Sequence, residues 1–509
     1  MAGSSAAAIP PNIDWGKWSL GHNIFHEKRW QQILDSQDED FKRAKLAFLR
    51  LEVYAGDLSE LVYLRTKVTD DLRKYVQHIW LNAAFRKCEC QPDEAEPDAE
   101  TIQHKKQHVK LLQDAVTHLF KVLADWKEPG PNGNGIAIEL SAQSFSYKSH
   151  FNFDKSYLGS RDEIGARLKT EVVHKDLGIS AFADYTKSVH QDMTFRFCSE
   201  RMPTLPGVTK FVLRRQFRHS LMSPPEDYAS IRDFGLKAIF RTMPNLECLV
   251  YEPWRAWDDK NQRLYDLEYK TLFSTLPLGV RNISVFEDNN ESYARRIAGV
   301  DRLLRVRNPS LGQAVARASQ QLKTLSVAFM VEAEDFFTEC MGKEGFQWPH
   351  LKSLALTSRP LAHNDHNLIL DMLKNAAKVA ERMPYLNTMT VWFGAKHKAY
   401  CLAYHHRDGR SRIAWQGTEP LLHDPVLIEF WATVAGKHRT SFLGFEQPGL
   451  SDIDWKLRNK YFAGLAGGLI SAQELKSHGD AVFLLGDYLP EDVVDRVSLW
   501  QMQQEARVL

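Results

Sequence analysis

A short strand pattern recurs through the middle of the chain and restricts its possible folds more than any other feature. In each copy, three apolar anchors stand at the first, fourth and sixth positions. The copies are VTKFVL at 208–213, LECLVY at 246–251, VRNISV at 280–285, LKTLSV at 322–327, LKSLAL at 351–356 and LNTMTV at 386–391. Their first anchors are 29 to 42 residues apart. A pattern that returns at a bounded spacing is typical of repeat architectures.

The intervals between the copies have the apolar spacing of helices. One such interval carries Ile369, Met372, Leu373, Ala376 and Val379. Four copies have a proline one or two residues before the first anchor: Pro206, Pro244, Pro349 and Pro384. Proline ends a helix because it lacks the amide donor, so the chain turns into the next strand at a fixed place. Each unit is thus one strand and one helix, and neither can bury its apolar face without its neighbours.

The pattern predicts an α/β fold, namely an irregular leucine-rich-repeat-like solenoid over residues 71–450. We expect a flexible tail at 1–12 and a helical N-terminal region at 13–70 before it. A C-terminal helical cap is expected at 451–509, where Val493, Val494, Val497 and Trp500 have helical spacing. The repeats are longer than the 20–29 residues usual for leucine-rich repeats. A doubly wound α/β sheet is the alternative, and the recurring intervals and prolines favour the solenoid.

Composition excludes several classes of protein. Of the 509 residues, 44% are hydrophobic and 25% charged, which is typical of a folded chain. The 65 Lys and Arg residues balance 64 Asp and Glu residues, so no bulk positive charge favours nucleic acid as a partner. No apolar run is long enough to span a membrane, and the start does not resemble a signal peptide. The six scattered cysteines indicate a reducing compartment, so we expect a cytoplasmic or nuclear protein.

Familiar catalytic and cofactor motifs do not occur in the sequence. There is no phosphate-binding glycine loop, no GxSxG and no HExxH. The histidines of greatest interest are His363, which lies near Asp365 and His366, and His405, which precedes His406 and Asp408. Polar loops account for both groups, so we predict no catalytic residue, no cofactor and no metal ligand. The alternative is an α/β enzyme of unrecognised type, in which such residues would converge in a closed pocket.

Aromatic residues near the ends of the predicted strands are candidates for a partner-binding surface. Residues at the rim of a repeat array are accessible, and Trp, Tyr and Arg are enriched where proteins bind one another. The candidates are Tyr251, Trp254, Arg255, Trp257 and Trp392. Packing between repeats is the other role that these side chains could have.

Several phrases resemble a family of ascomycete F-box-like proteins with a divergent leucine-rich-repeat-like region. The most specific are HIWLN at 78–82 and NISVFEDN at 282–289, and the resemblance covers roughly residues 45–450. It implies that an N-terminal F-box docks on the Skp adaptor of a cullin-type ubiquitin ligase and that the repeats select the ubiquitination substrate. This chain departs from the pattern at 1–50, which lacks the Leu-Pro-x-Glu opening of an F-box. We therefore expect a protein-binding repeat scaffold, with an F-box-type substrate receptor as its more specific form.

Overall fold

The computed structural model describes residues 29–54, 57–85, 99–126, 129–144, 202–214, 235–255, 259–288, 305–342, 345–362, 366–418, 424–446 and most of 475–502. The predictions for the tail at 1–12, for Trp257 and for His363 lie outside these residues. Among the described residues, none of the helices has the length and apolar character that crossing a membrane requires.

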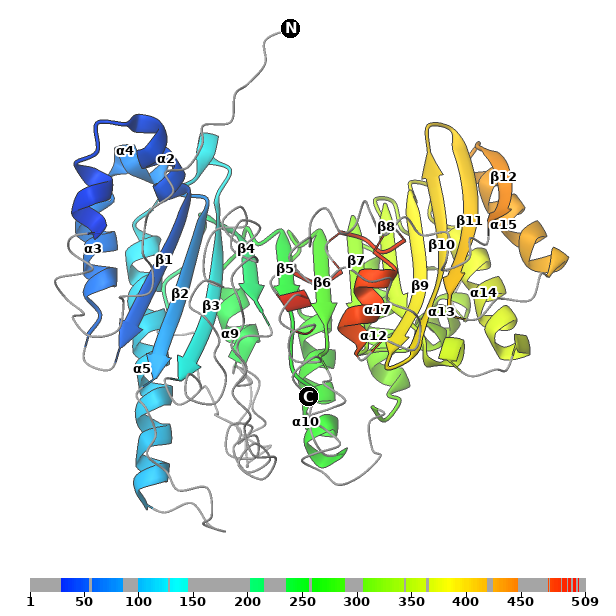
Figure 1. The fold of residues 1–509 in the computed structure, drawn as a ribbon, viewed down its shortest axis with the longest axis horizontal. Coiled ribbons are helices and arrows are strands. Elements are labelled where there is room, and N and C mark those ends of the chain that lie inside the picture. Colours follow the sequence, from blue (N-terminus) through cyan, green and yellow to red (C-terminus); the bar gives the residue numbers. More distant parts are fainter. Residues whose placement is uncertain are drawn as a thin grey trace, which may run out of the picture.

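Twelve strands form one sheet, and their order in the sheet is their order in the chain. Figure 1 shows them side by side from β1 to β12. A doubly wound sheet has a different strand order, because its chain starts near the middle of the sheet, adds strands to one edge and then adds strands on the other side. The strands are β1 (Phe48–Tyr54), β2 (His78–Phe85), β3 (Ile136–Ser144), β4 (Val208–Leu213), β5 (Cys248–Tyr251), β6 (Asn282–Phe286), β7 (Thr324–Ala328), β8 (Ser353–Thr357), β9 (Thr388–Ala395), β10 (Lys398–Arg407), β11 (Arg410–Gly417) and β12 (Ser441–Glu446).

All neighbouring strands are parallel except at β10, which pairs antiparallel with β9 and with β11. The β10–β11 turn contains Asp408 and Gly409, which both have positive φ, as two-residue hairpin turns require. The sequence pattern fades in this region, and neither strand was expected. The signal was present, because an Asp-Gly pair between strand-like runs is a strong indication of a hairpin.

The apolar anchors explain why the strands pair in this register. Leu249, Ile283, Leu325 and Leu354 stand opposite one another on four adjacent strands. Side chains alternate between the two faces of a strand, so the second and third anchors of each copy lie on the same face. Every anchor of the six copies is buried, which confirms the predicted core.

Helices cover the face of the sheet that carries the anchors. The series α10, α12, α13, α14 and α15 packs with each helix against the next. In α14 the five residues predicted from helical spacing are all buried. The helices are α2 (Glu39–Ala47), α3 (Ser59–Lys67), α4 (Asp70–Arg73), α5 (Ala99–Ala124), α9 (Gly235–Arg241), α10 (Asp259–Ser274), α12 (Pro309–Ser319), α13 (Ala333–Met341), α14 (His366–Ala380), α15 (Pro425–Lys437) and α17 (His478–Leu484).

The N-terminal region differs from the helical segment expected at 13–70. Residues 48–54 form β1, which pairs with β2, so the sheet begins before the expected boundary at residue 71. Leu49, Leu51 and Val53 alternate with more exposed residues, as in a strand with one buried face. Helices α2, α3 and α4 flank this strand in the sequence.

The C-terminal segment, defined here as the described residues of 475–502, also differs from the expected cap. Helix α17 packs against β9 and β10, and Figure 1 shows it in front of the sheet, on the side away from α10 and α12. Within the expected helical cap, Val493 and Val494 are buried but not helical, whereas Ser498, Leu499 and Met502 are helical. The segment therefore packs across a face of the sheet instead of extending the sheet at its end.

Candidate functional site

The face of the sheet away from the helix layer, here called the outer face, has two unlike halves. Its half near the carboxyl ends of the strands holds a second apolar core. In this core the sheet residues Phe286, Ala328 and Trp392 pack against Leu485, Val493 and other residues of the C-terminal segment. The sheet is therefore buried on both faces here, and a partner cannot reach this half without displacing the C-terminal segment.

Phe329 lies at the centre of the contact between the sheet and the C-terminal segment. Its backbone has a φ of 62°, in the left-handed region that a residue with a side chain rarely adopts. The amide N–H donates to Thr357 Oγ1 at 2.7 Å, which satisfies the donor at this bend. The ring lies 5.2 Å from that of Trp392 and 5.4 Å from that of His478, both edge-on. The strained backbone thus places an aromatic ring between β9 and α17.

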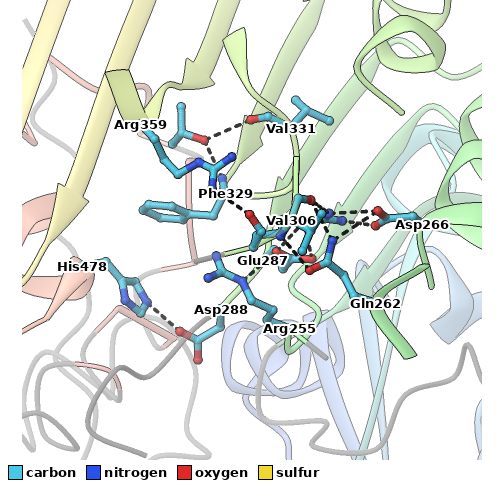
Figure 2. Close-up of polar contacts among 12 residues, drawn as sticks. Arg255, Gln262, Asp266, Glu287, Asp288, Val306, Phe329, Val331, Arg359 and His478 are labelled. Atoms are coloured by element: carbon cyan, nitrogen blue, oxygen red, sulfur yellow. Dashed lines mark hydrogen bonds and ion pairs between the residues drawn. The ribbon is translucent and has the colours of Figure 1, made fainter. Parts of the chain in front are cut away.

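Two buried carboxylates at the ends of neighbouring strands hold the C-terminal segment by polar contacts. Asp288, which follows β6, contacts His478 with 2.6 Å between Oδ1 and Nε2 (Figure 2). Glu252, which follows β5, accepts from the backbone N–H of Asp495 at 2.7 Å and from the hydroxyl of Ser498. A buried carboxylate is costly unless it is paired. These contacts therefore fix the path of the segment across the strand ends.

A second set of charged groups closes the same edge beside these contacts. Figure 2 shows Glu287, Asp266 and Arg255 converging there. Arg305 donates from Nε to Glu287 Oε2 at 3.0 Å and from Nη1 to Asp266 Oδ2 at 3.1 Å. Arg255 donates from Nε to the same Glu287 oxygen at 3.1 Å. One buried carboxylate is thus shared by two guanidinium groups.

The pKa directions in this cluster follow from its contacts. Burial lowers the pKa of Arg255; Glu287 opposes this, and Arg305 and Arg359 lower it further. Burial also acts to lower the pKa of Arg305, but Glu287 and Asp266 raise it overall. Arginine stays charged in proteins, so neither group serves as a general base. Because the charges are paired with one another, the cluster is suited to holding the strand ends rigidly and offers no vacant charge to a ligand.

The structure places the five predicted partner-binding residues in different environments. Tyr251 faces the helix layer, where its ring meets that of Tyr269 at 6.1 Å, and burial raises its pKa. Trp392 is fully buried beneath the C-terminal segment. Both pack in cores, so the prediction of partner contact fails for these two. Arg255 is largely buried in its ion pair, Trp254 is partly buried beside Asp288, and Trp257 lies outside the described residues.

The histidine and acidic residues weighed as catalytic or metal-binding groups have separate surroundings. The ring of His405, on β10, lies 6.4 Å from that of Tyr488. Asp408 is exposed in the β10–β11 turn, where its carboxylate lies 3.5 Å from Arg407. Within the described ranges, no group of three His, Cys, Asp or Glu residues has a geometry suited to a metal ion.

The half of the outer face near the amino ends of the strands has a different character. One residue from each of six strands forms a polar row, in which each member stands opposite the next. The polar row consists of Lys210, Cys248, Asn282, Thr324, Ser353 and Thr388. All six are partly exposed, in contrast to the buried residues two positions further along most of these strands. Thr324 Oγ1 donates to Asn282 Oδ1 at 3.1 Å, so the row is partly cross-linked.

Sequence reasoning did not identify the residues that organise this face. Glu252 and Asp288 each follow a strand within two residues, in LVYEPW and SVFEDN, and this repeated placement was a usable signal. His478 and Ser498 had no such signal, because their partners are 190 and 246 residues away in the chain. The polar row could have been read from the third position of each strand copy.

Comparison with known proteins gives one match. Residues 275–495 match a family of unknown function (DUF6546). The matched stretch includes β6–β12 and the C-terminal segment as far as Asp495, so it contains both sides of the Asp288–His478 contact. No curated protein and no solved structure matches the chain.

Proposed function

We propose that this protein is a protein-binding scaffold built as an irregular leucine-rich-repeat-like solenoid. The observation that carries the proposal is the polar row, a partly exposed line of polar side chains across six adjacent parallel strands. The solenoid is supported by the chain-order sheet and by helices that contact their neighbours in series. In repeat proteins, stacked units of this kind present an extended binding surface.

The dimensions of the row favour a macromolecule over a small ligand. Adjacent strands lie about 4.7–4.9 Å apart, so six strands span roughly 24 Å. Hydroxyl and amide groups both donate and accept hydrogen bonds, which suits the backbone and polar side chains of another protein. The row also lies on the half of the outer face that the C-terminal segment does not fill.

The scaffold is tested by affinity purification of the tagged full-length chain from its own cells, with quantitative mass spectrometry. A Thr324→Arg/Ser353→Arg variant places two long charged side chains in the polar row. Its matched control is Ser274→Arg/Thr433→Arg, which makes the same changes at exposed helix positions. We expect a near-stoichiometric partner that the control retains and the row variant loses. Equal recovery with both variants would show that the partner does not use the row, and recovery of no such partner would refute the scaffold.

The more specific form of the proposal is an F-box-type substrate receptor of a cullin ubiquitin ligase. It rests on the family resemblance, and the F-box would fall within residues 1–70, of which the structure describes 29–54 and 57–70. Co-expression of the full-length chain with the Skp adaptor, followed by size-exclusion chromatography, tests it. Co-elution at equal molar amounts is expected of a receptor. Separate elution would refute ligase membership and leave the scaffold untouched.

A further inference from the structure

Three basic residues, Arg281, Lys323 and Lys352, lie in register immediately before β6, β7 and β8, at the amino edge of the sheet. Backbone N–H groups donate across this edge from Lys323 to Arg281 O at 2.6 Å and from Lys352 to Lys323 O at 2.7 Å. The pairing of Asn282 with Thr324 and of Thr324 with Ser353 gives the same alignment. Adjacent strands are about 4.7–4.9 Å apart, so three positive charges emerge at close spacing.

These basic side chains have no carboxylate partner in the described part of the chain. Lys323 and Lys352 are exposed, and neither takes part in an ion pair or a side-chain hydrogen bond among the described residues. Arg281 donates from Nη1 to the carbonyls of Leu278 at 2.8 Å and Gln321 at 3.3 Å, which positions its charge without neutralising it. Like charges in register repel one another. An anionic group that binds at this edge would therefore be stabilised by the three positive charges.

Two exposed apolar side chains flank the basic residues. Leu278 is 83% exposed and Tyr385 is 60% exposed, the two highest values among the large hydrophobic residues of the described chain. Leu278 lies in the turn before β6, and Tyr385 lies in the turn before β9. Each follows a proline, which fixes the backbone that presents it. Leu278, Arg281, Lys323, Lys352 and Tyr385 together are called the amino-edge patch below.

We propose that the amino-edge patch binds an acidic segment of a partner protein that also carries apolar side chains. The proposal rests on the proposed scaffold function and names the chemistry of the partner. Carboxylates of the segment pair with Lys323 and Lys352, and its apolar residues cover Leu278 and Tyr385. Aromatic and arginine residues are enriched among the groups that contribute most to protein interfaces, and the patch contains both.

Charge and apolar content together favour this occupant over a nucleic acid. Glu247 is exposed and stands beside Arg281 in the same row, so the basic stretch ends in an acid after three strands. A continuous polyanion would meet that acid, whereas a short acidic segment need not extend so far. Leu278 offers no hydrogen-bond donor to a phosphate group, and the exposed apolar surfaces of Leu278 and Tyr385 favour apolar side chains.

The test is selection of a displayed random peptide library against the immobilised full-length protein. Selected peptides are then synthesised with a fluorescent label and titrated by fluorescence anisotropy. The patch variant is Lys323→Glu/Lys352→Glu. Its matched control is Lys110→Glu/Lys121→Glu, which makes the same charge change on the exposed face of α5. A Leu278→Ser/Tyr385→Ser variant tests the apolar flanks, and Lys323→Gln/Lys352→Gln removes the charges without reversing them.

We expect the enriched peptides to combine Asp or Glu with apolar residues and to bind more weakly as salt is raised. Their affinity should fall at least tenfold with either charge variant and with the apolar variant, and should be unchanged with the α5 control. Peptides that bind the patch and control variants equally would overturn the proposal while leaving the scaffold in place. Enriched peptides without acidic residues, or failure to enrich any peptide, would overturn it as well, while the scaffold is judged separately by the recovery of a partner from cells. A heparin oligosaccharide that binds the patch more tightly than every acidic peptide would show a general polyanion site, which also overturns the proposal.

Discussion

Adding one methyl group at Gly394 on β9 should weaken the packing of the C-terminal segment against the sheet. A Cβ added there would lie 2.6 Å from the Cβ of Ala481 in α17. That contact must widen to at least 3.4 Å to reach ordinary van der Waals distance. The Cβ of Ala481 is attached directly to the helix backbone, so no side-chain rotation can provide the space. The whole of α17 must therefore move away from the sheet.

Gly394→Ala should destabilise the docked segment by about 1–3 kcal/mol, the usual cost of overpacking a filled core. This corresponds to an opening constant about 5- to 140-fold larger. Hydrogen–deuterium exchange of peptides covering α17 measures it directly, because local opening controls exchange there. Gly436→Ala is the matched control, since an added Cβ there meets no heavy atom within 4 Å beyond its chain neighbours and its own helix backbone. Unchanged exchange in Gly394→Ala, or equal loosening in Gly436→Ala, would refute the reasoning.

Three further predictions concern the cores and their titrating groups. Leu354→Ala should lower the free energy of unfolding in urea by about 2–5 kcal/mol because it leaves a cavity. Leu278→Ala, at a side chain that is 83% exposed, should change it by less than about 0.5 kcal/mol. Equal effects of the two variants would contradict the assigned core. Burial lowers the pKa of His438 below its ordinary 6.5, so the unfolded chain takes up the proton first as the pH falls. The free energy of unfolding should therefore decrease as the pH drops below about 7. In urea titrations at several pH values, His438→Gln should weaken this pH dependence, and an unchanged pH dependence would contradict the role given to His438. Iodoacetamide should modify the partly exposed Cys248 in the native protein. It should react with Cys401 only after unfolding, because burial shields that thiol and raises its pKa. Peptide mass spectrometry that finds Cys401 modified first would contradict this prediction.

Local patterns in the sequence were sufficient to predict one of the two cores. The anchors such as Leu325 and Leu354 could be found because strand and helix alternate at a bounded interval. Burial then followed from the requirement that each unit cover its neighbour. The helix α14 was equally accessible, because its buried residues recur at the helical period.

Strand β1 shows why one apolar pattern can mislead. Phe48 and Leu51 continue the helical spacing of the preceding residues, yet Leu49, Leu51 and Val53 also alternate as a strand does. Propensity alone does not choose between the two periods in such a short segment. In the structure this segment is a strand that pairs with β2. The pairing places Leu49 opposite Ile79 and Leu51 opposite Leu81.

The second core could not be predicted because it depends on contacts between distant parts of the chain. Trp392 looked like a rim residue, since it ends a strand and no nearby sequence covers it. In the structure it is buried by residues of the C-terminal segment, such as Leu485. The same segment pairs His478 with Asp288, and no periodicity connects two residues 190 positions apart.

The two ends of the strands differ in how their charges are balanced, and this difference gives the proposed surface its specificity. At the carboxyl ends, Glu287 is paired with Arg255 and Arg305, and Asp288 contacts His478, so the chain balances its own charges there. At the amino ends, Lys323 and Lys352 have no such partners in the described chain. Repulsion between like charges on a binding surface makes the surface selective. A partner of opposite charge removes that repulsion, whereas a partner of the same charge increases the repulsion. The C-terminal segment occupies the half of the outer face whose charges are already balanced, and it leaves open the half where the proposed partner would balance Lys323 and Lys352.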